Sequence, residues 1–241
     1  MPSAGFQHVA RTHVGCRREL NEDAVLECPD RGLWAVADGM GGHEAGEVAS
    51  RIVVEALAAC PPGTGEHELV QSVRASLEVA NARLVSLSRA EFGGRTIGST
   101  IVALVAGERN YTCFWAGDSR AYLVRDGAIE RLTRDHSMVQ DLVDAGMLGE
   151  EEAQAHPNAN IITRAVGVSD VLEVDTVSGE IRADDVFLLA TDGLTRLVSD
   201  DELLAELRGG DIADSASRLL KMTLERGAAD NVSLVILRRL T

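Results

Sequence analysis

Three apolar segments of this sequence each end in an aspartate that a small residue follows at once. The segments are LWAVADG, CFWAGDS and VFLLATDG, and their terminal pairs are Asp38–Gly39, Asp118–Ser119 and Asp192–Gly193. A fourth acid, Asp230, stands directly before the apolar segment NVSLVIL. One Asp-Gly pair alone is typical of an ordinary turn. The repetition, with a fourth acid beside an apolar segment, instead indicates carboxylates placed at the ends of buried strands.

The direction of the strands can bring these acids together. If the last apolar segment runs antiparallel to residues 186–191, its start lies beside the end of that strand, so Asp230 and Asp192 share one edge of the sheet. A strand that ends in Asp38 from the same direction adds a third carboxylate. Carboxylates this close repel one another, and without a positive charge some of them become protonated. A bound divalent cation removes this conflict, so the acids predict a metal site.

The ligand chemistry favours a hard cation. All candidate ligands are oxygens, and no Cys or His stands at ligand spacing, so Mg²⁺ or Mn²⁺, or else Ca²⁺, suits the site better than Zn²⁺. Gly39 lets the backbone approach closely enough for its carbonyl to serve as a further ligand. The four cysteines are far apart and form no CxxC pair, which favours free thiols in a reducing compartment over a zinc site or disulfides.

Charge and composition exclude several classes of partner. The chain has 23 basic and 38 acidic residues, a net charge of -15, and 3% aromatic residues. Such a surface repels phosphate backbones and offers few stacking platforms, which excludes nucleic acid as a partner. No segment approaches the ~20 apolar residues of a membrane span, and the N-terminal segment MPSAGFQHVARTHVGCRREL has no signal-peptide core. We therefore expect a cytoplasmic protein.

The apolar periodicity predicts a single domain over residues 1–241. Amphipathic helices are expected at 44–59, 66–90, 137–148, 199–209 and 211–230. β-Strands are expected at 24–26, 33–37, 99–107, 111–117, 120–127, 128–133, 172–181, 185–193 and 231–240, the four from 99 to 133 as a meander. Helices come in groups rather than alternating with strands, which disfavours a parallel sheet. The layout predicts an α+β fold, with two face-to-face antiparallel β-sheets flanked by pairs of α-helices.

The N-terminal segment RRELNEDAVL adds two arginines to the set of acids. Arg17 and Arg18 precede Glu22 and Asp23, which lead into a β-type segment. A guanidinium near a metal cluster is suited to binding a phosphate group through its planar fork. A surface salt bridge for either arginine, and a solvated turn for the acids, are the alternatives at this point.

Eight motifs also occur in a recognisable order. They are RRELNEDA, VADGMGGHEAGEVAS, GST, WAGDSRAYLVRDG, LTRDHS, NIITRAVG, LLATDGL and DNVSLVIL. In this order, over about residues 10–237, the sequence resembles the metal-dependent type-2C (PPM) Ser/Thr protein phosphatases. The variant DGMGGH and residues 134–167 resemble the bacterial branch of that family.

The resemblance implies a two-metal centre built from the acids at the strand ends. Asp38 matches the ligand that bridges the two ions, and the Gly39 carbonyl matches a ligand on one of them. Asp192 and Asp230 match ligands on the other ion. The ions implied are Mn²⁺ or Mg²⁺, two per site, with a weaker third.

The family also implies roles around this centre. Glu22 matches an acid that holds metal-bound water, and Asp118 matches the acid of the weaker third site, which it shares with Asp192. Arg18 stands four residues before Glu22, where the family places its phosphate-binding arginine. Arg17 fits that spacing less well.

Two further segments match the family in position, and one departs from it. Residues 137–165 resemble the mobile flap beside the site, and Asn231 is expected to support the shell around the acid before it. Relatives with DGH carry a proposed general acid two residues after the bridging aspartate, where this chain has Met40, which cannot donate a proton. His43 and metal-bound water are the alternative proton donors.

The implied activity is Mg²⁺- or Mn²⁺-dependent hydrolysis of phosphoserine and phosphothreonine in proteins, by metal-activated water and without a phosphoenzyme. The implied partners are phosphoprotein substrates and a Ser/Thr kinase whose action the enzyme opposes, and a monomer is expected. Two alternatives remain open at this stage: a metal-dependent phosphoesterase for a small-molecule phosphate, and a catalytically inactive module that senses phosphoproteins.

Overall fold

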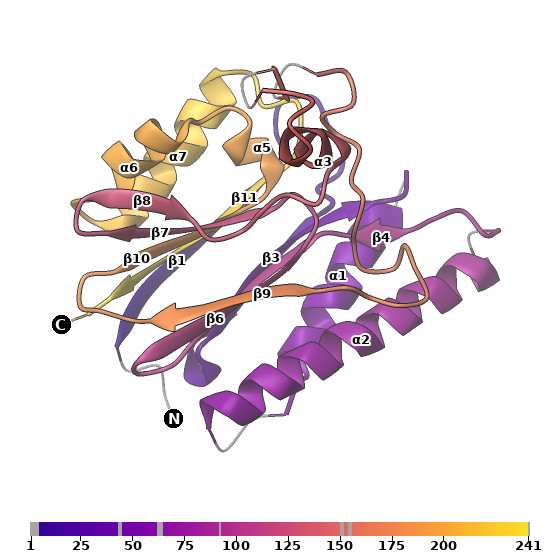
Figure 1. Cartoon of the computed structure of the whole chain (residues 1–241), viewed down its shortest axis with the longest axis horizontal. Helices are drawn as coiled ribbons and strands as arrows, with labels where there is room; N and C mark the ends of the chain where they lie inside the picture. Colours follow the sequence, from indigo (N-terminus) through magenta and orange to yellow (C-terminus); the bar gives the residue numbers. More distant parts are fainter. Residues whose placement is uncertain are drawn as a thin grey trace.

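Two antiparallel sheets lie face to face between two pairs of helices in the computed structural model (Figure 1). The structure describes residues 5–42, 45–61, 65–91, 93–149, 152–153 and 156–240. One sheet is covered by α1 (Ala45–Ala58) and α2 (Glu66–Glu91), and the other by α6 (Asp200–Leu207) and α7 (Ile212–Glu225). The α+β fold expected from the sequence is therefore confirmed.

The first sheet brings together strands from both ends of the chain. Its order is β1 (Phe6–His13), β11 (Val232–Arg239), β10 (Val186–Ala190), β7 (Arg120–Arg125) and β8 (Ala128–Arg131). β10 and β11 are antiparallel neighbours, with Ala190 opposite Leu234, as the strand-end argument requires. No strand is expected from the sequence at residues 6–13, yet β1 pairs with β11 along its whole length.

The second sheet supplies the strand that ends in the first Asp-Gly pair. Its order is β2 (Asp23–Cys28), β3 (Leu33–Met40), β5 (Ile101–Ala106), β6 (Asn110–Ala116) and β9 (Asp175–Glu180), and β4 (Gly98–Ser99) pairs with the end of β3. Three short helices complete the described elements, η1 (Pro29–Arg31), α3 (Met138–Asp144) and α5 (Asp192–Thr195).

The expected meander over residues 99–133 is wrong as a single unit. β5 pairs with β6 in one sheet, whereas β7 pairs with β8 in the other. The chain changes sheets at Gly117, whose φ of 120° lies in the region that favours glycine. Its backbone also passes so close to Thr100 that a Cβ at Gly117 would lie 2.6 Å from the threonine Cβ. Apolar runs look alike in either sheet, so the sequence does not reveal this crossing.

Several element boundaries also differ from the sequence expectation. The strand expected at 185–193 ends at Ala190, and Asp192 already opens a short helix. The strand expected at 172–181 begins at Asp175, and the helix expected at 211–230 ends at Glu225. Ser199 caps α6 through a reciprocal capping box with Glu202. Among the described residues, no helix is long and apolar enough to cross a membrane.

The two sheets are held together by apolar side chains on their facing surfaces. Trp34 of β3 and Phe187 of β10 are fully buried in this layer. Phe187 meets the edge of Tyr111 in the facing sheet, with ring centroids 5.0 Å apart. A further apolar cluster lies between each sheet and the helices that cover it. The five residues of β10 are therefore buried on both faces, which explains their uninterrupted apolar sequence.

We predict that Phe187→Ala lowers the free energy of unfolding by about 3–5 kcal/mol, because it removes a buried ring and leaves a cavity between the sheets. Urea unfolding followed by circular dichroism measures this change. Val79→Ala on α2 is the control, since this side chain is 64% exposed and its removal should change stability by less than about 0.5 kcal/mol. Equal losses for the two variants would contradict the assignment of this layer as the core.

Candidate metal centre

The aspartates at the strand ends converge at one end of the two sheets. Asp192 follows β10, and Asp230 precedes the neighbouring strand β11. Asp38 reaches the same place from β3 of the facing sheet, so it comes across the sheet interface and not along the same edge. Burial and the charges of the surrounding aspartates raise the pKa of Asp38 well above its usual range.

Unpaired carboxylate oxygens make the cluster a candidate cation site. Within the described part of the chain, six buried side-chain polar atoms have no hydrogen-bond partner, and four of them are carboxylate oxygens of this cluster. These four are Glu22 Oε1, Asp23 Oδ1, Asp118 Oδ1 and Asp192 Oδ1. Burial also raises the pKa of Asp118 to about 7. Orphaned anionic oxygens in such numbers are costly unless a cation satisfies them.

The strand-end position of Asp38 is fixed through its backbone. Its N–H donates to Thr100 Oγ1 at 3.0 Å, and its carbonyl accepts from the Thr100 N–H at 2.8 Å. The Ser99 hydroxyl donates to the same carbonyl. The Thr100 hydroxyl also pairs with Ser119, which directly follows Asp118. The GST motif therefore couples the positions of two acids while leaving the Asp38 carboxylate free.

Asn231 ties the N-terminal segment to the last strand. Its side-chain oxygen accepts from the Glu22 N–H at 2.8 Å, and its amide donates to the carbonyls of Val14 and Leu20. Its own N–H donates to Asp230 Oδ1 at 2.9 Å. A single buried amide thus sets the distance between Glu22 and Asp230, in agreement with the supporting role expected for it.

Glu22 lies against the beginning of α1. The Gly46 N–H donates to its carboxylate, a favourable place for a negative charge at a helix N-terminus. Burial nevertheless raises the Glu22 pKa above its usual value. A Cβ at Gly46 would collide with Glu22 Oε1 and would lie 2.7 Å from the Gly39 carbonyl oxygen. A Cβ at Gly39 would likewise collide with the Gly46 carbonyl, so close backbone approach explains both glycines.

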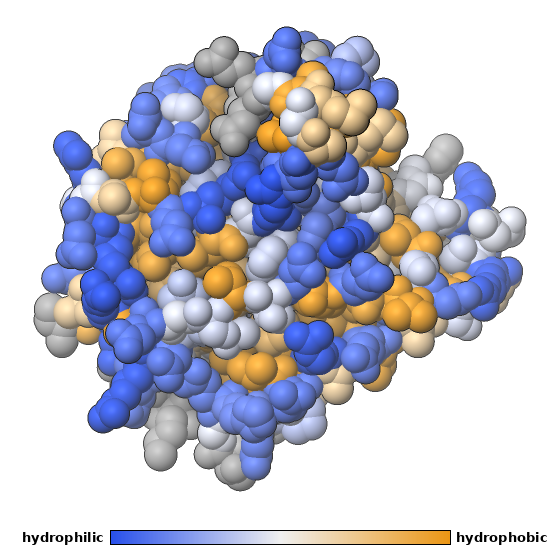
Figure 2. Space-filling view, viewed as in Figure 1, coloured by the Kyte–Doolittle hydropathy of each residue, from blue (hydrophilic) through white to orange (hydrophobic). Residues whose placement is uncertain are grey.

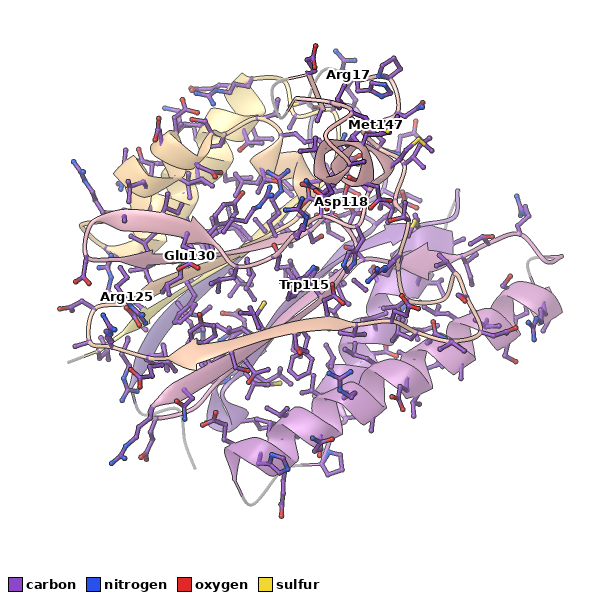
Figure 3. All side chains as sticks on the ribbon, in the orientation of Figure 1. Arg17, Trp115, Asp118, Arg125, Glu130 and Met147 are labelled. Atoms are coloured by element: carbon purple, nitrogen blue, oxygen red, sulfur yellow. The ribbon has the colours of Figure 1, made fainter. Side chains whose placement is uncertain are left out.

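The two arginines of the RRELNED segment differ in position. Arg18 Nη2 donates to Asp230 Oδ2 at 2.9 Å, and its Nη1 lies 4.0 Å from Glu22 Oε2. Arg17 is exposed and lies at the outer surface (Figure 3). Arg18 is therefore the arginine at the acid cluster, as the spacing predicts.

Asp118 and Asp192 share a guanidinium that the sequence analysis did not identify. Arg196 donates through Nη2 to Asp118 Oδ2 at 3.2 Å and contacts Asp192 Oδ2 through Nε at 2.7 Å. Its position four residues after Asp192 is a common helical ion-pair spacing. That spacing alone does not connect Arg196 with Asp118, which lies far away in the sequence.

Asp23 is a second group at the cluster without an assigned role. It pairs opposite Asp38 in the β2–β3 ladder, and its Oδ2 accepts from the Thr191 hydroxyl at 3.0 Å. Burial and the neighbouring carboxylates raise its pKa to about 7. Its position directly after Glu22, at the start of an apolar strand, is the sequence feature that could have placed Asp23 at the cluster.

The donor set fits a hard divalent cation. Every titratable ligand candidate at the cluster is a carboxylate, the donor type that Mg²⁺ and Mn²⁺ share. Among the residues described, no three ligand side chains enclose one point in the present arrangement. Arg18 and Arg196 hold the Oδ2 atoms of Asp230 and Asp192, and the orphaned oxygens described above remain available to ions.

The expected flap and proton donor are placed only in part. Within residues 137–165, the structure describes 137–149, 152–153 and 156–165, and apolar side chains gather over this region (Figure 2). Met138, Met147 and Ile161 are exposed there. Met40 is the last residue of β3, and His43 lies outside the described residues.

Comparison with known proteins shows consistent similarity over nearly the whole chain. A family model described as Protein phosphatase 2C matches residues 15–232. Serine/threonine protein phosphatase PstP of Mycobacterium tuberculosis is 37% identical over 231 residues, which are 96% of this chain and 44% of that relative. The chain thus spans less than half the length of that curated relative.

Solved structures show the same similarity. PppA, described as a key regulatory component of the T6SS in Pseudomonas aeruginosa, has a TM-score of 0.91 and 38% identity, covering 98% of each chain. The catalytic domain of PstP in complex with two manganese ions has a TM-score of 0.88 and 36% identity, covering 98% of this chain and 99% of that one.

We predict that Gly46→Ala lowers the free energy of unfolding by about 1–3 kcal/mol, because its methyl group displaces Glu22 and presses on the Gly39 carbonyl. The direction is diagnostic, since Ala in a helix is otherwise favoured over Gly by about 1 kcal/mol. Thermal unfolding in the presence of EDTA measures the change without any contribution from metal ions. Gly209→Ala, where a Cβ meets open space, is the control. A stabilised Gly46→Ala variant would show that the helix start does not contact Glu22 as described.

Proposed function

This chain belongs to the protein phosphatase 2C family, and we propose that it hydrolyses phosphoserine and phosphothreonine in proteins with two bound Mn²⁺ or Mg²⁺ ions. The observation that carries this proposal is the convergence of buried carboxylates from two facing sheets, with oxygens that no protein group satisfies. A structural acid cluster would be expected to pair these oxygens internally. An ion centre needs them free.

The proposed ligands follow from the placement of the acids. Asp38 comes from the facing sheet and interacts electrostatically with the aspartates of both sheets, which suits a ligand shared by two ions, and Gly39, whose carbonyl is a further proposed ligand, follows it directly. Asp192 and Asp230, on neighbouring strands, are proposed to hold the second ion. Glu22, held at the start of α1, is proposed to act through a water molecule. When bound, the ions supply positive charge and lower the pKa of water toward neutrality.

The other groups bind and orient the phosphate. Arg18 is half exposed, with 48% of its side chain accessible, so its guanidinium can turn from Asp230 to a substrate phosphate without leaving the protein surface. Its planar fork matches two phosphate oxygens. Thr100 and Asn231 hold the backbone of the acids, so the positions of the acidic groups are set before substrate binds.

The cellular setting is a further part of the proposal. The four cysteines are free thiols, which suits a cytoplasmic protein, and we propose that the protein is a monomer. By the chemistry of the reaction, the counterpart is a Ser/Thr kinase that supplies the phosphoproteins. No described contact favours the two alternative functions, a small-molecule phosphoesterase and an inactive phosphoprotein sensor. The first experiment below distinguishes both from a protein phosphatase.

We predict hydrolysis of phosphothreonine and phosphoserine peptides in the presence of Mn²⁺, with little activity on phosphotyrosine peptides or nucleotides. EDTA should abolish the activity, and added Mn²⁺ should restore it. Asp38→Asn removes the proposed shared ligand and should lower kcat at least about a hundredfold. Release of inorganic phosphate measures all of these. Preference for nucleotides would identify a small-molecule enzyme, and folded protein without turnover at any Mn²⁺ concentration would identify a sensor.

A second prediction separates the two adjacent arginines. Arg18→Ala should raise KM for a phosphopeptide by about 10–100-fold, since it removes a charge-assisted hydrogen bond worth about 1.5–3 kcal/mol. Arg17→Ala is the matched control and should leave both kcat and KM within about twofold of the unchanged protein, as an exposed residue away from the acids. Steady-state kinetics on one phosphothreonine peptide measures both. The reverse pattern would show that the phosphate site uses Arg17.

A further inference from the structure

We propose that Asn81 of α2 is a positioning residue for the metal centre, which it reaches through the backbone of residues 166–170. The ligands concerned are Asp38 and Gly39 at the end of β3, so the inference rests on the proposed function. It gives a helix on the outside of the sheets a part in fixing the positions of these two ligands.

Asn81 is a buried amide whose oxygen and nitrogen both contact one segment of the chain. It is 3% exposed. Its Oδ1 accepts from the Gly167 N–H at 2.7 Å. Its Nδ2 donates to the Ser169 carbonyl at 2.9 Å and to the Asp170 carbonyl at 3.5 Å. Because a buried amide is costly unless its polar atoms are paired, these contacts tie residues 167–170 to α2.

The tied segment fits closely between α2 and β4. Gly167 has a φ of 91°, and a Cβ there would lie 2.7 Å from the Ile97 carbonyl oxygen and 2.7 Å from the Cβ of Leu84 in α2. A Cβ at Gly98 of β4 would lie 2.8 Å from the Val166 carbonyl oxygen. The chain then passes over α2 before it enters β9 (Figure 1). A displacement of this segment therefore acts directly on β4.

Val166 connects the segment to the end of β3. Val166 and Ser99 are fully buried and exchange two backbone hydrogen bonds, each of 2.9 Å. Ser99 pairs opposite Gly39 in the β3–β4 ladder, and its hydroxyl donates to the Asp38 carbonyl at 3.0 Å. The positions of both proposed ligands thus depend on a residue that directly precedes the segment held by Asn81.

An ion pair at the surface also joins α2 to this segment. Arg89 Nη2 lies 2.7 Å from Asp170 Oδ1, with the two side chains 67% and 73% exposed. Exposed pairs of this kind contribute little to holding a segment in place. The buried amide is therefore the stronger polar connection, and Arg89→Ala is a control that removes the weaker one.

Asn81→Ala should weaken Mn²⁺ binding about tenfold or more, the usual effect of losing a group that supports metal ligands. It should also lower kcat when Mn²⁺ is limiting. KM for a phosphothreonine peptide at saturating Mn²⁺ should stay almost unchanged, because Arg18 is held by Asp230 before β11. Equilibrium dialysis measures the ion affinity without turnover, and steady-state kinetics measures kcat and KM.

Two further variants separate positioning from stability. Asn81→Asp has almost the same volume and still accepts from Gly167, but its carboxylate cannot donate, so its Mn²⁺ affinity should lie between those of Asn81→Ala and the unchanged protein. Ser215→Ala removes a fully buried hydroxyl that donates to the Glu206 carbonyl and joins α7 to α6. It should lower the Tm without changing Mn²⁺ affinity. Unchanged Mn²⁺ affinity in Asn81→Ala, or an equal loss in Ser215→Ala, would overturn the inference.

Hydrogen exchange of the unchanged protein provides a test that needs no variant. Because coupling between two sites is reciprocal, Mn²⁺ binding should slow exchange of the Gly167 and Ser99 N–H groups. The Ser215 N–H, which donates to the Asp211 carbonyl, should exchange at the same rate with and without Mn²⁺. Bound Mn²⁺ without any effect at Gly167 would contradict the role of Asn81 and leave the metal centre intact. Absence of Mn²⁺ binding would overturn the proposed metal centre itself.

Discussion

Mutual repulsion among buried carboxylates is the constraint on which this structure depends. Aspartates from two sheets and a glutamate from the N-terminal segment lie within range of one another in a partly desolvated site, where like charges raise each other's pKa. Such an arrangement persists only if the surrounding fold is rigid enough to hold it and a cation is at hand. The two guanidiniums supply part of the positive charge that the carboxylates need. The unpaired oxygens are the positions where further positive charge would bind.

Rigidity comes from groups that carry no charge. Thr100 fixes the backbone of Asp38 from the neighbouring strand, and the Asn231 amide joins the N-terminal segment 14–22 to the start of β11. Gly39 and Gly46 permit a backbone approach that any side chain would prevent. The apolar layer between the sheets then supplies the burial that stabilises the fold. The acids are thus positioned by ordinary packing and backbone hydrogen bonds.

The sequence predicts those features of the site that depend on local pattern or on neighbouring strands. Asp192 and Asp230 were placed together correctly, because an antiparallel pair brings the end of one strand beside the start of the next. Asp38 was expected near them, but its origin in the facing sheet was not, since an apolar run carries no record of the sheet it joins. Arg196 was missed for a related reason. Its contact with Asp118 spans two elements whose proximity exists only after folding.

Because β1 pairs with β11, the acid cluster can form only late in the synthesis of the chain. The first and last described strands are neighbours in one sheet, and Asp230 and Asn231 stand immediately before the last. A nascent chain still on the ribosome before β11 has emerged lacks both the aspartate and the amide that anchors Glu22. The many contacts between distant residues also favour slow, late closure of the sheet. A chain that has been synthesised only as far as β10 therefore lacks part of the acid cluster and the side chain that positions Glu22.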